Sequence, residues 1–181
     1  MTKFILIRHC KAEGQEQHAE LTMEGFQKAN ELVRFLDSYN ISRIISSPFT
    51  RTIQTITPYA LNKNIQIEVD ERLKERILSS ENLPDWYEKL QQSFQQPNLK
   101  LSGGESSYEA TRRILSLIKD LKNSDSAYIV LVTHGNLSAL LLNYISQNFG
   151  FKDWQQLSNP DVYIVESHLD VLSYKRIWTQ I

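Results

Sequence analysis

The sequence predicts an α/β domain: a three-layer sandwich with a mainly parallel central sheet and helices on both faces. Two apolar runs, at residues 4–7 and 128–133, show little polar alternation, as expected of strands that are covered on both sides. Between such runs lie longer segments in which apolar residues recur every three or four positions, which indicates amphipathic helices. Alternation of buried strands with helices is typical of parallel sheets packed between helices.

The clearest helix start lies within residues 21–39, after a polar loop. Thr22 is placed to cap the helix N-terminus, and Leu21 is placed to pack against the first turn. The apolar side chains that predict its buried stripe are Phe26, Ala29, Val33 and Leu36. We therefore expect a helix that packs one face against the sheet.

A strand, a helix and a third strand follow. Residues 43–47 predict a second buried strand, and residues 65–69 alternate as a third strand does. Residues 48–62 predict a helix with Pro48 at an early position and Pro58 where it kinks or ends. Strand and helix thus alternate through this half of the chain.

Residues 70–104 interrupt the alternation, and we expect them to form an insertion that makes one wall of a pocket. A short helix is predicted at residues 83–96. Its aromatic residues, at a helical spacing suited to a core or to a pocket wall, are Trp86, Tyr87 and Phe94.

The last part of the chain returns to the sheet. Residues 102–123 predict a helix in which Ser106 and Glu109 form a capping box. The remaining predicted elements are a strand at 128–133, a helix at 134–149 and two closing strands at 162–167 and 169–178.

Composition limits the function. The 181 residues, 41% of them hydrophobic, suffice for one core, so we expect a single domain over residues 1–181. A formal net charge of -1 supports neither a nucleic-acid partner nor an anionic membrane, and no apolar run is long enough to cross a bilayer. The single cysteine, Cys10, and an N-terminal apolar run too short for a signal peptide predict a cytoplasmic protein.

Two histidines follow the ends of predicted strands. His9 comes directly after the first strand and Arg8, and His134 follows the strand at residues 128–133. Ligands of α/β sheets bind beyond the carboxyl ends of strands, so we expect both imidazoles in one pocket. Arg51 lies near the start of the helix that follows the second strand.

These residues suit a phosphoryl group. A neutral imidazole at His9 is a nucleophile that needs no metal ion, and the guanidinium groups of Arg8 and Arg51 can bind phosphate oxygens. His134 can donate to a developing charge, and amides at helix N-termini can add to the phosphate site. We therefore expect phosphoryl transfer by positioning and electrostatics.

An ordered set of motifs resembles the histidine phosphatase superfamily, also called phosphoglycerate mutase-like. The motifs are RHC at 8–10, LTMEG at 21–25, SSPFTRTIQT at 46–55, LKE at 73–75, GGES at 103–106 and VTHG at 132–135. The resemblance implies a phosphohistidine intermediate on His9. It also implies a phosphate site formed by Arg8, Arg51 and His134.

The resemblance further implies a carboxylic acid that protonates the leaving group and later activates water. Glu75 in the LKE motif resembles that acid, and Glu105 in the GGES motif is the alternative. Cys10 stands where the family usually has glycine, so a side chain is added beside the nucleophile. The Trp-Glu-Gly signature expected after Arg76 is absent, which leaves the substrate open.

The leading functional prediction is a metal-independent phosphomonoesterase that requires no cofactor and acts on a small phosphorylated metabolite. Three alternatives stay open: a phosphoglycerate mutase-type phosphoryl transfer, a protein phosphohistidine phosphatase, and a non-catalytic module that binds a phosphorylated ligand. The physiological substrate and the oligomeric state stay open as well.

Overall fold

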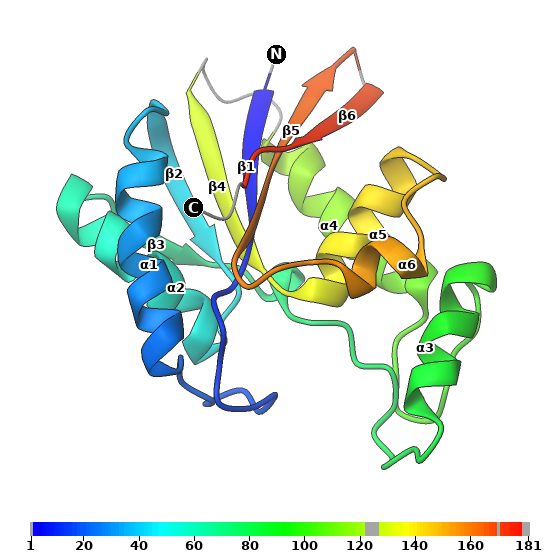
Figure 1. Ribbon diagram of the computed structural model, residues 1–181. Helices are drawn as coiled ribbons and strands as arrows, with labels where there is room; N and C mark the ends of the chain where they lie inside the picture. The colour runs from blue at the N-terminus through cyan, green and yellow to red at the C-terminus, as the bar shows by residue number, and fades with distance from the viewer. Residues whose placement is uncertain (1, 122–126, 170, 179–181) are drawn as a thin grey trace.

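A mixed sheet forms the middle layer of the protein in our computed structural model, which describes residues 2–121, 127–169 and 171–178 (Figure 1). Its strand order is β3-β2-β4-β1-β5-β6. The first four strands in this order pair in parallel, and β5 and β6 pair antiparallel at one edge. The strands are β1 (Thr2–Arg8), β2 (Ile41–Ser46), β3 (Ile67–Val69), β4 (Tyr128–Thr133), β5 (Asp161–His168) and β6 (Val171–Arg176).

Helices cover both faces of this sheet, which confirms the predicted three-layer α/β architecture (Figure 1). Helices α1 and α2 pack together on one face, and α4 and α5 pack together on the other. The helical elements are α1 (Met23–Leu36), α2 (Thr50–Lys63), the 3-10 turn η1 (Glu71–Leu73), α3 (Trp86–Gln95), α4 (Ser107–Leu121), α5 (Gly135–Ile145) and α6 (Phe151–Gln155).

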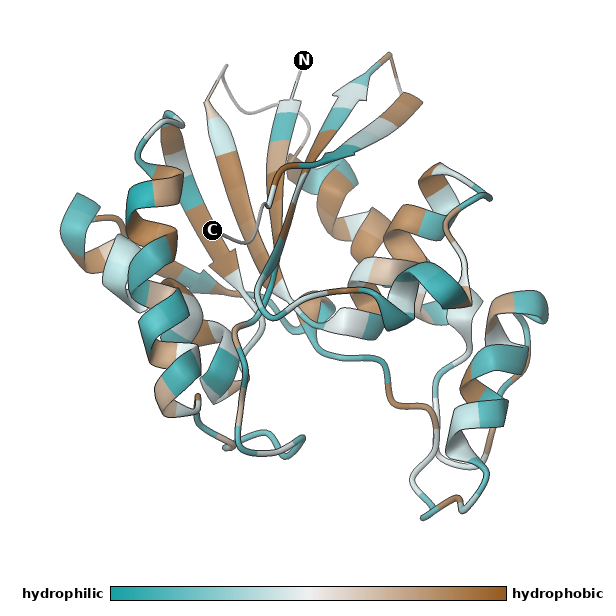
Figure 2. Cartoon of the chain, in the orientation of Figure 1, coloured by the Kyte–Doolittle hydropathy of each residue, from teal (hydrophilic) through white to brown (hydrophobic). Residues whose placement is uncertain are grey.

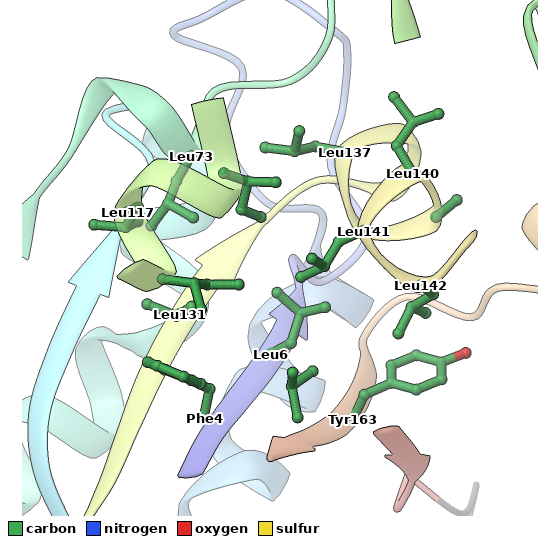
Figure 3. Close-up of a cluster of buried hydrophobic side chains, with 14 of the residues drawn as sticks. Phe4, Leu6, Leu73, Leu117, Leu131, Leu137, Leu140, Leu141, Leu142 and Tyr163 are labelled. Atoms are coloured by element: carbon green, nitrogen blue, oxygen red, sulfur yellow. The ribbon is translucent and has the colours of Figure 1, made fainter. Parts of the chain in front are cut away.

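Strand β1 is buried on both of its faces, as its sequence predicts. Because side chains alternate along a strand, Phe4 and Leu6 enter the core beneath α4 and α5, which Figure 3 shows. Ile5 and Ile7 enter the second core beneath α1 and α2. In Figure 2 the central strands are correspondingly apolar, and the helices carry polar residues on their outer sides.

Helix α1 begins where predicted, because the Thr22 Oγ1 atom accepts a hydrogen bond from the Gly25 amide at 3.0 Å. The predicted buried stripe is wrong in part. Ala29 and Leu36 are buried as predicted, whereas Phe26 is 39% exposed and Leu32 is buried in addition. The residues of α1 that are buried are Gly25, Ala29, Leu32 and Leu36.

Helix α2 begins later than predicted and continues past Pro58. Pro48 precedes the helix, whose N-cap is Phe49, and Pro58 lies inside it without ending it. Buried Tyr59, just after the proline, holds the C-terminal half of the helix against the core. The helix ends at Asn64, which adopts a left-handed conformation with φ 54°.

The segment between β3 and α4 extends away from the sheet and carries α3 (Figure 1). Helix α4 starts at the predicted capping box, since Ser106 N donates to Glu109 and Glu109 N donates to the Ser106 hydroxyl. The end of the helix predicted at 102–123, from residue 122 on, lies outside the described residues, as does residue 170 of the last predicted strand. Within the part of the chain that is described, no helix has the length and apolarity to span a bilayer.

Candidate active site

The ends of three neighbouring strands bring the predicted residues together. Arg8 at the end of β1 pairs with Thr133 at the end of β4, so His9 and His134 follow side by side. The centroids of the two imidazole rings are 5.2 Å apart. Strand β2 ends beside β4 in the same way and places Ser47 next to His134, with a hydrogen bond between the side chains.

One nitrogen of the His9 ring is hydrogen-bonded to a backbone carbonyl, and the other faces the Arg51 guanidinium. Its Nδ1 lies 2.6 Å from the carbonyl oxygen of Cys10, which can only accept, so the geometry assigns the proton to Nδ1. Its Nε2 then carries the lone pair and accepts a hydrogen bond from Arg51 Nε at 3.2 Å. Burial lowers the pKa of His9 to about 3, so the ring is neutral near pH 7.

Arg51 is 1% exposed and holds the two histidines in place. Its Nη1 donates to the backbone oxygens of Gln15 at 3.1 Å and Glu16 at 2.8 Å, which ties the loop after β1 to α2. Its Nη2 lies 3.3 Å from His134 Nδ1. Arg51 therefore contacts both imidazoles with one planar guanidinium.

His134 is fully buried and is also neutral. Burial lowers its pKa well below the ordinary value, and the proximity of His9 and of Arg51 lowers it further. Because Arg51 is a donor, His134 Nδ1 accepts, and Nε2 donates to the Ser47 hydroxyl at 2.8 Å. The ring of Phe49 packs edge-on against His134 at 4.8 Å between centroids.

Arg8 reaches across the site to the loop before β5, where its Nη1 donates to the Leu157 carbonyl at 2.8 Å. Its buried Nε has no hydrogen-bond partner among the described residues. The guanidinium lies against Gly135, since a Cβ there would come within 2.9 Å of Arg8 Nε. Because Gly135 of the VTHG motif has no side chain, the Arg8 guanidinium can lie close to its backbone.

The Glu75 carboxylate caps helix α5. Its Oε2 accepts from the Asn136 amide at 3.0 Å, and its Oε1 accepts from the Leu137 amide at 2.9 Å. Two N-terminal amides of α5 therefore orient Glu75. Glu105, the alternative acid, instead forms a bidentate ion pair with Arg113 at 2.7 and 2.9 Å.

A cavity of about 450 Å³ opens beside these groups. Arg8, Glu75 and Gly135 line the side next to the histidines. Glu105 does not line this cavity; it borders a separate one with Arg113. Gln15, Arg76 and Asn136 also line the cavity beside the histidines, and its apolar lining is formed by four residues, Leu78, Trp86, Leu90 and Trp154.

Cys10 does not add its side chain to the pocket. The residue is fully buried in the core beneath α1 and α2, and its amide donates to the Thr55 hydroxyl at 2.9 Å. Burial raises the pKa of the Cys10 thiol to about 12, so it stays protonated and unreactive. The side chain that the sequence adds beside His9 therefore lies in the core and does not line the cavity.

Three residues that contact the histidines were not predicted from the sequence. Ser47 and Phe49 lie inside the SSPFTRTIQT motif, and their closeness to Arg51 in the sequence is the feature that could have indicated them. Asn159, whose Nδ2 donates to the His9 carbonyl at 2.8 Å, lies 150 residues from it in a loop without any periodic pattern. Only the fold brings that loop to the site.

An α/β sheet with two buried histidines, two arginines and a carboxylate near its strand ends is the arrangement that the histidine phosphatase motifs in the sequence predict. The family model for the histidine phosphatase superfamily (branch 1) matches residues 4–177. The chain belongs to this superfamily, and its phosphatase members indicate that it is an enzyme.

Named relatives agree with that assignment. Phosphoserine phosphatase 1 of Hydrogenobacter thermophilus is 26% identical over 150 residues, covering 74% of this chain and 71% of the relative. A mycobacterial glucosyl-3-phosphoglycerate phosphatase in complex with inorganic phosphate has the same fold, with a TM-score of 0.79 and 20% identity over 98% of this chain and 96% of that chain. A phosphoserine phosphatase of Entamoeba histolytica in complex with 3-phosphoglyceric acid has a TM-score of 0.76 and 24% identity over 99% and 98% of the two chains.

Proposed function

We propose that the protein is a metal-independent phosphomonoesterase that works through a phosphohistidine on His9. The observation that carries the proposal is the state of the His9 ring: neutral, with Nδ1 bound to the Cys10 carbonyl and the Nε2 lone pair facing Arg51. A phosphate group replaces Nε2 as the acceptor for Arg51 and thereby frees the lone pair for attack. The substrate is a small phosphorylated metabolite.

In the first step His9 Nε2 attacks phosphorus, the N–P bond forms and the bond to the leaving oxygen breaks. A protonated Glu75 gives its proton to that oxygen, while Arg8 and Arg51 stabilise the charge on the other phosphate oxygens. His134 adds to them in the tautomer that carries the proton on Nδ1, with Nε2 accepting from the Ser47 hydroxyl. The Cys10 carbonyl holds the proton on Nδ1 and so stabilises the phosphorylated imidazolium.

In the second step water attacks phosphorus and the N–P bond breaks. Glu75, now a carboxylate, accepts the proton of that water. Inorganic phosphate leaves, and His9 is again neutral. Glu75 suits both steps better than Glu105, because Glu75 lines the cavity with Arg8 whereas Glu105 is bound to Arg113.

The test is a rapid quench with a ³²P-labelled phosphomonoester. We expect an acid-labile label on the wild-type protein that decays as phosphate is released, and no label on His9→Ala. Loss of His9 should lower kcat by about 10⁴-fold or more, since the nucleophile is removed. Equal hydrolysis by wild type and His9→Ala would contradict the proposal.

The same experiment separates the alternatives. Return of the label to a second phosphoglycerate position faster than phosphate release would identify a mutase. Preferential removal of phosphate from a phosphohistidine-bearing protein would identify a protein phosphatase. Tight binding of the ester with no label and no release would identify a binding module.

A further inference from the structure

We propose that the apolar side of the cavity, formed by Leu78, Trp86, Leu90 and Trp154 and here called the apolar wall, binds the leaving group of the substrate. The substrates are then phosphomonoesters of alcohols that carry an apolar group of aromatic size. This inference rests on the proposed function. It adds the class of alcohol, which neither the phosphate-binding residues nor the relatives determine.

The apolar wall joins two parts of the chain that are far apart in sequence. Helix α3 of the insertion packs against α6 through aromatic contacts, with the Tyr87 and Phe151 rings 5.2 Å apart and the Phe94 and Phe151 rings 5.9 Å apart. Phe151 in turn stacks on Trp154 at 5.3 Å. These contacts fix the positions from which Trp86 and Trp154 border the cavity.

Trp86 is the most exposed residue of the apolar wall. It is 51% exposed, whereas Leu90 beside it in the same helix is buried. Burying a half-exposed indole against a ligand removes apolar surface from water, and an aromatic ligand adds a favourable ring contact. The cavity volume of about 450 Å³ lies in the range of small-molecule sites, so it can hold a ring beyond the phosphate.

Both cations at the cavity already donate to other groups, which weakens their attraction for an anionic leaving group. The two cations are Arg8, which lies beside His9, and Arg76. Arg76 is 6% exposed, and two of its nitrogens already donate to the Glu105 carbonyl at 2.9 Å and the Ser93 hydroxyl at 2.7 Å.

The experiment compares phosphate esters of three primary alcohols: 2-phenylethyl phosphate, ethyl phosphate and O-phosphoserine. We measure kcat/KM for each with the full chain, by phosphate release. The 2-phenylethyl ester should exceed both others about tenfold, from burial of one ring. Trp86→Ala should remove about that factor for the 2-phenylethyl ester only, and Trp86→Phe should restore most of it.

Two controls isolate the wall from the phosphate site. Vanadate contains no leaving group, so its inhibition constant should be the same for Trp86→Ala and wild type. Tyr108→Ala removes an aromatic residue of equal exposure, 51%, that does not line this cavity, and should leave all three esters unaffected.

Phosphoserine turned over as fast as the 2-phenylethyl ester would overturn the inference and leave the phosphatase proposal intact. An equal loss of kcat/KM for all three esters in Trp86→Ala would also overturn the inference, because it would show that the substitution impairs catalysis in general and not the binding of the ring. Hydrolysis of none of the esters by the wild type would instead overturn the proposed function, and the inference with it.

Discussion

At the scale of single residues, the hydrogen-bond partners of the two imidazoles decide what each can do. His9 is bound at Nδ1 by a carbonyl oxygen, which leaves Nε2 as the nucleophilic nitrogen. His134 is bound at Nε2 by the Ser47 hydroxyl and faces Arg51 with Nδ1. A hydroxyl both donates and accepts, so Ser47 can support His134 whichever nitrogen carries the proton.

This contact predicts a role for Ser47 in positioning His134. Ser47→Ala leaves the buried Nε2 of His134 without its partner, so kcat for a phosphomonoester should fall about tenfold with little change in KM. A histidine ¹⁵N NMR spectrum should show a changed tautomer balance for His134. Steady-state kinetics and the spectrum together check the prediction.

Ser46→Ala is the matched control. Ser46 is equally buried, but its hydroxyl donates to the Ser47 carbonyl at 2.9 Å and touches neither histidine. It should keep kcat and the His134 spectrum of the wild type. Identical kinetics for the two variants would show that Ser47 acts only through packing.

At the scale of elements, the site depends on where strands end and helices begin. Strand β4 ends at Thr133 and α5 begins at Gly135, so the start of the helix meets both Arg8 and Glu75. The strand and the helix were predictable from their apolar patterns. The hydrogen bonds from the α5 amides to Glu75 were not predictable, because Glu75 and Asn136 lie about sixty positions apart in the sequence.

Gly135→Ala tests this close approach. The added Cβ would lie 2.9 Å from Arg8 Nε, so the guanidinium must shift, although alanine itself favours a helix over glycine. The inhibition constant for inorganic phosphate should rise about tenfold, which corresponds to the loss of one charged hydrogen bond. The melting temperature should stay close to that of the wild type. Inhibition assays and thermal unfolding check both parts.

Gly150→Ala serves as the comparison. Gly150 also lies at the start of a helix, α6, but a Cβ there would have no atom within 4 Å. Its phosphate inhibition should match wild type. Equal weakening in both variants would refute a specific role for Gly135.

At the scale of the whole molecule, folding buries two uncharged histidines between two hydrophobic cores. Burial lowers the pKa of His9 to about 3 and that of His134 well below the ordinary value. In the unfolded chain both titrate near their ordinary pKa of about 6.5. The unfolded chain therefore binds more protons below that pH, and stability is lost as pH falls.

We accordingly predict that the free energy of unfolding decreases from pH 6.5 toward pH 4, by up to about 1.4 kcal/mol per pH unit for each histidine. Urea unfolding across this interval should show a shallower pH dependence for the double variant His9→Asn, His134→Asn. Carboxylates titrate in both proteins, so the difference between the curves isolates the histidines. Parallel curves would contradict the assignment of neutral, buried rings.

Local patterns along the chain were sufficient to predict the α/β class, the order of the elements, the cap at Thr22 and the family motifs. These depend on local periodicity and on short spacings, which a linear chain displays directly. The tertiary structure alone decided which face α1 buries, why Pro58 leaves α2 unbroken, and that Cys10 points into the core. It also decided that Ser47 and Asn159 support the histidines and that α3 meets α6, because these contacts join residues far apart in sequence.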